Sequence, residues 1–384
     1  MRFLANQNYD DFEVIVSDNY TDPSLSCEFF CRNTAVKNVR YIRPPEPLGM
    51  VGNWNYALEH ATGDYIFFFT DKMFLLPGTL SYVENVLRES PAEILSWVDN
   101  KFTPFLFSNY FGKGMYYPSH PGVNTKKPFE AFDPRAELSK KVLAEVSRGE
   151  QSSSHYARGK ICFGGYSRSL VKRIQDYSGS LFHNLSPDYT SMILGLSIAD
   201  SAIEISRPGI VHINTNLSNG GRASIRDDLA LSYLNSLGKD DSFFDKTLVP
   251  NLYSSVHNNV AHDYISLKHK FNLNYELNRV NWLVYITEDL NLPTRIWSSP
   301  KVEYEHRKLL ADFIEKNLNE EERAEYLLKL ETRTAPIDIR RLIVFLRPFI
   351  PKKIWNMLRL LRSRKLYKAS VKNNIYDLLR ADVL

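Results

Sequence analysis

Asp71 and Lys72 form the polar end of an aromatic stretch. The preceding run, residues 66–69 (Ile-Phe-Phe-Phe), is apolar and too short for a helix. It predicts a strand that is buried on both faces. Open α/β sheets bind their ligands beyond the carboxyl ends of the strands. We therefore expect the Asp71 carboxylate to face a ligand, and the alternative is an aspartate that only begins a turn.

Two more aspartates lie at the ends of predicted elements. Asp18 follows residues 12–17, which predict an inner strand. Asp188 lies in the first turn of a helix predicted over 185–196, where the helix dipole favours a carboxylate. The structural alternative for Asp188 is a simple N-terminal charge, which stabilises a helix by a fraction of a kcal/mol, roughly 0.3–1.

Predicted strands and helices alternate around these residues, which is typical of an α/β fold. We expect residues 1–225 to form one domain, a mostly parallel sheet with helices on both sides. Residues 226–384 are predicted to form a helical region. The polar stretch 151–160 is predicted to be a mobile loop. Further strands are predicted at 39–43, 94–98, 161–168 and 202–213, and a helix that suits a phosphate at its start is predicted over 49–61.

The stretches 12–22, 49–64 and 64–77 resemble, in their order and spacing, the nucleotide-sugar-binding half of family 2 glycosyltransferases with the GT-A fold. The resemblance covers about residues 6–90 and extends more loosely to about 220. It implies a hexosyltransferase-like enzyme that moves a sugar from a nucleotide-diphosphate donor to a hydroxyl of a glycan or lipid-linked acceptor. It also implies inversion at the anomeric carbon and a role in surface polysaccharide synthesis.

The resemblance gives a role to each matching residue. Asp18 corresponds to the aspartate that hydrogen-bonds the base, and Asn55 corresponds to an asparagine on the helix predicted over 49–61. Asp71 corresponds to a residue in the part of the donor site that binds the ribose and the diphosphate, and it is the candidate ligand for Mn²⁺ or Mg²⁺. Asp188 corresponds to the general base that takes the proton of the acceptor hydroxyl. Arg222 is a candidate phosphate contact.

Several positions depart from the family pattern. The last acidic residue of the Asp71 group, which binds the metal in the family, is Lys72 here. A protonated lysine cannot ligate a metal, but it can neutralise a diphosphate as a point charge. We hypothesise that Lys72 replaces the metal wholly or in part, and the alternatives are a solvated turn residue or an inactive site. Trp54 lies where many members carry an arginine. His212 matches a histidine that some members place near the metal, or is a structural residue.

Residues 1–8 resemble the end of the family's first helix rather than its opening strand. We therefore expect the first strand to be missing. Either the chain is a fragment or its start is misassigned, or the site is incomplete. The three cysteines, Cys27, Cys31 and Cys162, lack metal-site spacing and indicate a reducing compartment. Neither a signal peptide nor a run of about 18 apolar residues is present, so we expect a cytoplasmic protein.

The basic character of the chain belongs to its tail. The net charge is +4, and residues 340–376 contain 11 lysines and arginines and no acid, so the rest of the chain is net acidic. Apolar and basic residues alternate there, which predicts peripheral contact with the inner face of a membrane or a basic helix packed on the domain. No nucleic-acid partner is expected. The runner-up function is a catalytically inactive GT-A-like binding or assembly module, and nucleotidyl transfer is a weaker third.

Overall fold

The computed structural model describes residues 1–19, 24, 26–105, 111–118, 127–145, 157–213, 219–239, 241–333 and 370–379. The chain forms two compact units. The first comprises Met1–Leu138, Ser152–Asn214 and Leu366–Leu384, and the second comprises Ser139–Gln151 and Thr215–Lys365.

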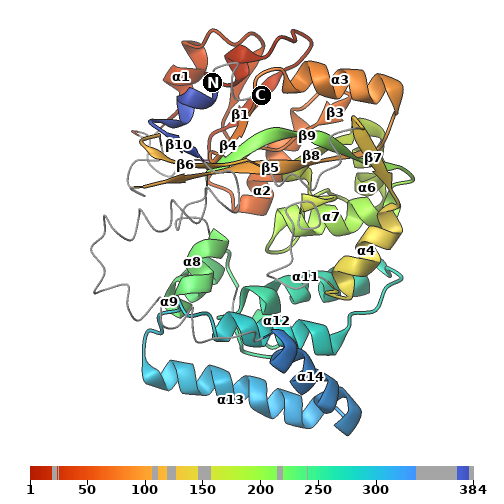
Figure 1. Cartoon of the computed structure of the whole chain (residues 1–384), viewed down its shortest axis with the longest axis vertical. Helices are drawn as coiled ribbons and strands as arrows, with labels where there is room; N and C mark the ends of the chain where they lie inside the picture. The colour runs from red at the N-terminus through yellow and green to blue at the C-terminus, as the bar shows by residue number, and fades with distance from the viewer. Residues whose placement is uncertain are drawn as a thin grey trace. The chain divides into compact units, whose positions relative to one another are not determined.

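A sheet of eight described strands forms the centre of the first unit. Its two long members, β5 (Ile94–Pro104) and β9 (Ala202–Ile213), run parallel and side by side (Figure 1). Helix α3 (Thr79–Glu89) lies on one side of the sheet and α7 (Pro187–Ile198) on the other (Figure 1). The predicted α/β fold with flanking helices is thereby confirmed.

The strand directions are mixed, although the sequence predicted mostly parallel strands. The long strand β9 is the reason, because β5 pairs with it in parallel while β4 and β7 both pair with it antiparallel. The pairs β5–β6, β5–β8, β3–β8 and β6–β10 are antiparallel as well. The shorter strands are β3 (Tyr65–Ile66), β4 (Met73–Leu75), β6 (Gly114–Tyr117), β7 (Phe129–Phe132), β8 (Gly164–Ser167) and β10 (Ser370–Lys372).

Two strand predictions are corrected by the structure. The strand expected to lie inside the sheet, β1 (Val14–Ser17), is half-buried and pairs, among the described residues, only with β2 (Val39–Ile42) in a separate parallel pair. The aromatic run is not a strand buried on both faces, because β3 ends at Ile66 and Phe69 is 38% exposed. Phe67 and Phe68 instead stack on the rings of Trp97 and Trp54. Ring stacking rather than strand pairing therefore buries their apolar surface.

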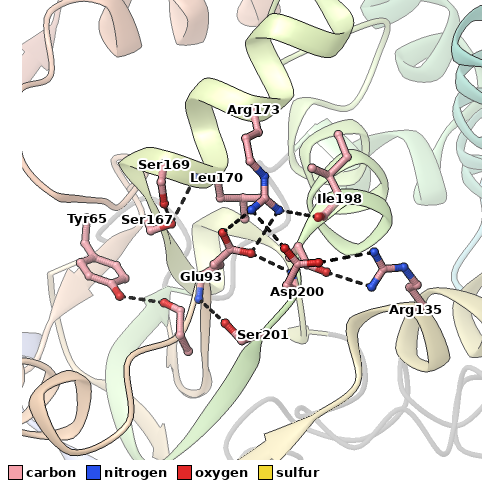
Figure 2. Close-up of polar contacts among 12 residues, drawn as sticks. Tyr65, Glu93, Arg135, Ser167, Ser169, Leu170, Arg173, Ile198, Asp200 and Ser201 are labelled. Carbon is pink, nitrogen blue, oxygen red and sulfur yellow. Dashed lines mark hydrogen bonds and ion pairs between the residues drawn. The ribbon is translucent and has the colours of Figure 1, made fainter.

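A network of ion pairs fixes the amino ends of β5 and β9 (Figure 2). Glu93, directly before β5, lies 2.8 Å from Arg173, and its backbone N–H donates to the Ser201 hydroxyl, directly before β9, at 3.1 Å. Asp200 lies 3.2 Å from Arg173 and 3.7 Å from Arg135. Since Asp200 and Arg135 are largely exposed, we assign this network to the register of the two strands rather than to a large gain in stability.

The second unit is helical, as predicted for the C-terminal region. Its core includes Val284 and Leu283 from one helix and Leu310 and Tyr326 from two others. Its helices are α8 (Asn219–Ile225), α9 (Asp227–Ser236), α10 (Asp241–Phe244), α11 (Val256–Phe271), α12 (Arg279–Leu290), α13 (Pro300–Asn317) and α14 (Glu320–Arg333).

Of the predicted basic tail, residues 340–376, only 370–376 lie among the described residues. There, β10 pairs with β6 in the first unit. The prediction of membrane contact through the remainder of the tail lies outside the described residues. None of the helices that the structure describes is both long and apolar enough to cross a membrane.

Candidate active site

Asp188 is held by a buried lysine. Helix α7 begins at Pro187, so Asp188 lies in its first turn as predicted. The Lys160 ammonium lies 3.1 Å from Asp188 Oδ2 and 3.5 Å from the centre of the Tyr189 ring. The lysine side chain is only 1% exposed, whereas the aspartate is 27% exposed. Burying an ammonium group is costly without a partner, so the carboxylate and the aromatic face both favour this position of the lysine.

The segment that carries Lys160 is fixed by neighbouring elements. The Gly159 N–H donates to Ser96 Oγ on β5 at 2.9 Å. The Tyr166 hydroxyl, on β8, bridges the carbonyl of Gly159 and the carbonyl of Ser191 on α7. Residues 157–160 are therefore ordered and largely buried, which corrects the prediction of a mobile loop for the part of 151–160 that the structure describes.

A second group of side chains gathers where β4 begins and where β5 and β9 approach their carboxyl ends. The sheet register pairs His212 with Lys101 on one side and with Met73 on the other. The Ile213 N–H donates to the Lys72 carbonyl at 2.8 Å, which brings Lys72 beside this histidine. Burial, followed by the positive charges of Lys101 and Lys72, lowers the pKa of His212 to about 4. The imidazole is therefore neutral at pH 7.

One turn of 3-10 helix, η3 (Ile161–Phe163), connects the two groups. Lys160 directly precedes it, and the ring of Phe163 at its end packs edge-on against His212, with 6.3 Å between ring centres. A 3-10 helix rises about 2 Å per residue, so these two attachment points are roughly 6 Å apart along its axis. Gly164 follows directly, and a Cβ there would lie 1.8 Å from the Leu95 carbonyl oxygen on β5. The close approach of backbones therefore requires a glycine.

The residues around Asp71 do not fit a resident divalent cation. Such a cation needs several oxygen or nitrogen donors. Across the described residues, no group of three or more His, Cys, Asp and Glu side chains could hold a metal ion. Asp71 is exposed and precedes Lys72, and the charges of Lys72 and Lys101 both act on the nearby His212. Two ammonium groups repel a divalent cation, so these residues disfavour one at this position.

The proposed base contact, Asp18, has protein partners. Its Oδ2 accepts hydrogen bonds from the Cys27 backbone N–H at 2.9 Å and from the Tyr41 hydroxyl at 3.1 Å. These bonds fix the start of helix α1 (Glu28–Arg32), which follows directly. All contacts of the Asp18 carboxylate within the described parts of the chain use this one oxygen.

Asn55, on α2 (Met50–Glu59), also has protein partners. Its side-chain amide donates to the Phe182 carbonyl at 3.0 Å and accepts from the Phe182 N–H at 3.3 Å. Trp54, beside it, packs against Phe182 and Phe68 with ring centres 5.1 and 5.2 Å away. Helix α2 is thereby tied to the segment that leads into α7 and Asp188. Arg222, the predicted phosphate contact, lies in α8 of the second unit.

Lys160 and Lys101 are the residues that sequence reasoning missed. Lys160 lies at the end of a serine-rich stretch and 28 residues from its partner, and no local pattern signals that it is buried. Lys101 follows the predicted strand 94–98, and the actual length of β5 was needed to align it with His212.

A comparison with protein families matches residues 1–111 to glycosyl transferase family 2. No curated protein sequence matches the chain. Among solved structures, S. aureus TarS 1–349 in complex with UDP-GlcNAc is similar with 15% identity and a TM-score of 0.40, over 81% of this chain and 83% of that chain. The same protein in complex with UDP gives 14% identity and a TM-score of 0.40, over 83% and 87% of the two chains.

The family match covers the strands and helices that hold Asp18, Asn55, Asp71 and Lys72, together with β5 and Lys101. Residues 1–111 are thus a glycosyl transferase family 2 region.

Proposed function

We propose that this chain transfers a sugar from a nucleotide-diphosphate donor to an acceptor hydroxyl, with inversion at the anomeric carbon, in the synthesis of surface polysaccharide. The observation that carries the proposal is the partly exposed Asp188 carboxylate, which forms an ion pair with the buried Lys160. The short helix η3 connects Lys160 to His212, beside Lys72. A base and a place for a negatively charged leaving group are the two parts that such a transfer needs.

The proposed reaction is a single displacement. The acceptor oxygen attacks the anomeric carbon and forms the new glycosidic bond, while the bond between that carbon and the diphosphate oxygen breaks. The acceptor proton passes to Asp188, and the bonding electrons leave with the nucleoside diphosphate. Attack and departure occur on opposite faces of the sugar ring, so the configuration inverts. Asp18, Asn55 and Asp71 are proposed donor contacts, with Asp18 on the base.

Lys160 has a positioning role in this proposal. It engages Asp188 Oδ2, so that Oδ1 is the oxygen available for the acceptor proton. Precise placement of a base contributes to the rate, because proton transfer requires hydrogen-bond distance in the reacting complex.

A second candidate function, binding of a nucleotide sugar without transfer, is favoured by one observation. Three proposed site residues, Asp18, Asn55 and Asp188, already contact protein groups. A chain of this kind would bind a donor as an assembly module and would release no nucleoside diphosphate beyond the uncatalysed rate.

The test is release of nucleoside diphosphate from a panel of UDP-, GDP- and dTDP-sugars, with glycan and lipid-linked acceptors. Asp188→Asn is expected to lose roughly 10²- to 10⁴-fold in turnover and to keep donor binding, because only the proton acceptor changes. Asp176→Asn, on the exposed side of α6 (Arg168–Ser178), is the matched control and should be unchanged. Donor binding with no turnover in the unaltered protein would favour the binding module.

A further inference from the structure

We propose that Lys72, Lys101 and His212 together form a diphosphate subsite in which two ammonium groups take the place of a divalent cation. This inference rests on the proposed function, since the diphosphate belongs to the donor. Lys101 and His212 join Lys72 in this subsite. The residues do not suit a metal ion, because the positive charge that holds the diphosphate comes from the two lysines.

The placement of the three residues comes from three neighbouring strands. Lys101 and His212 are register partners on the parallel strands β5 and β9, so their side chains emerge on the same face of the sheet. The backbone of Lys72, directly before β4, is bonded to Ile213 on the other edge of β9. The charges of both lysines act on this histidine, near the carboxyl ends of β5 and β9, where α/β sheets bind ligands.

The chemistry of the three side chains suits an anion. Lys101 is exposed and Lys72 is half-buried, so both can meet a ligand from solution. Two ammonium groups supply the same formal charge as Mn²⁺ or Mg²⁺, and each can donate several hydrogen bonds to phosphate oxygens. The neutral imidazole of His212 can add one more N–H donor without repelling either lysine. A leaving diphosphate gains negative charge, which this arrangement would stabilise.

The same three residues argue against a metal at this position. A metal site would need the imidazole nitrogen and the carboxylate of Asp71 to converge with further oxygen donors. Here the residue that follows Asp71 is a lysine, and the ammonium of Lys101 also acts on the histidine. A metal site is lined by negatively charged groups and this subsite by positively charged ones, so experiment can distinguish the two.

The experiment is calorimetric binding of inorganic pyrophosphate and of UDP, GDP and dTDP to the full chain, in EDTA and in Mn²⁺. We expect pyrophosphate and at least one nucleoside diphosphate to bind in EDTA. Lys101→Met is expected to weaken both interactions about tenfold or more, because it removes one charge-assisted contact. Lys172→Met, an exposed lysine on α6, is the matched control and should bind like the unaltered chain.

A second variant, Lys72→Asp, tests the reciprocal case. With a carboxylate in place of the ammonium, binding in EDTA should fall about tenfold or more, and Mn²⁺ should restore part of it. Binding that requires Mn²⁺ in the unaltered chain, with Lys101→Met unchanged, would overturn the subsite and leave the proposed function in place. Binding of pyrophosphate in EDTA without binding of any nucleoside diphosphate would instead support the subsite and contradict the proposed function.

Discussion

Lys160 Nζ lies 3.1 Å from Asp188 Oδ2, and the two residues come from segments 28 positions apart in the chain. The pair is asymmetric, because the lysine is buried and the aspartate is partly exposed. A fully exposed ion pair at this distance would contribute little to folding stability. A buried ammonium whose charge is directed at one carboxylate oxygen instead fixes the orientation of that carboxylate, which is the property a general base needs.

Replacement of Lys160 should therefore affect catalysis more than folding. Lys160→Met removes the charge at similar volume, and the Asp188 carboxylate that loses its partner is 27% exposed, so water can solvate it and the cost of an unpaired buried charge is largely avoided. We expect turnover to fall about tenfold or more, while nucleoside diphosphate affinity and the melting temperature stay close to those of the unaltered chain. Steady-state kinetics, calorimetry and thermal melting measure the three quantities. Turnover equal to that of the control Lys172→Met would show that the ion pair has no positioning role.

Trp54 is expected to stabilise the first unit rather than to bind phosphate. Its ring stacks on Phe68 and meets Phe182 edge-on. Trp54→Ala should reduce the free energy of unfolding by about 2 kcal/mol, since two aromatic contacts and a half-buried ring are lost. Phe30→Ala, on α1, is the control because that ring is 68% exposed and should matter by less than about 0.5 kcal/mol. Urea unfolding measures both. Equal effects of the two substitutions would contradict the packing role.

His306 should make the second unit sensitive to acid. Burial, and then the charge of Arg295, lowers the pKa of His306 to about 4, against an ordinary value of 6.5. Between these two values the unfolded chain binds a proton that the folded chain does not, so stability is lost as pH falls below about 6.5. The full effect approaches about 3 kcal/mol near pH 4.

The variant His306→Gln tests this dependence, because an amide can still meet the Ser254 hydroxyl that contacts the imidazole at 2.6 Å. Urea unfolding at pH 7, 6 and 5 should show a steeper loss of stability in the unaltered chain than in the variant. Parallel curves for the two proteins would rule out His306 as the source.

Cys27 should be unusually inert for a partly exposed thiol. Burial, and next its hydrogen bond to the Asp18 carboxylate, raises the pKa of Cys27 to about 12. Only about one thiol in 10⁴ is then ionised at pH 8, so alkylation by iodoacetamide should be correspondingly slow. Asp18→Asn should speed this alkylation, as followed by mass spectrometry of the Cys27 peptide. Modification of Cys27 in the unaltered chain as fast as in the urea-unfolded chain would contradict the assignment.

Elements with local signals were predictable from the sequence. Pro187 and Asp188 begin a helix because proline and a carboxylate favour its first turn. The strand that carries His212 follows from its run of β-branched residues. Strand direction was not predictable in the same way, because β4 and β7 reverse against β9 through tertiary pairing that leaves no local pattern.

The site itself was predictable only in part. The aspartates could be located at the ends of elements, but their partners depend on distant segments. Asn55 meets Phe182 across 127 positions, and Lys101 meets His212 only because β5 extends beyond the predicted strand. The aromatic run after Tyr65 was overestimated as a strand because side-chain stacking, rather than backbone pairing, satisfies its apolar surface.

The most direct test of the account is release of nucleoside diphosphate from nucleotide sugars in EDTA, with the unaltered chain and Asp188→Asn side by side. The account predicts turnover of at least one donor without added metal and its loss in the variant, with donor binding retained in both. Failure of the unaltered chain to turn over any donor, with or without Mn²⁺, or full activity of Asp188→Asn, would contradict it.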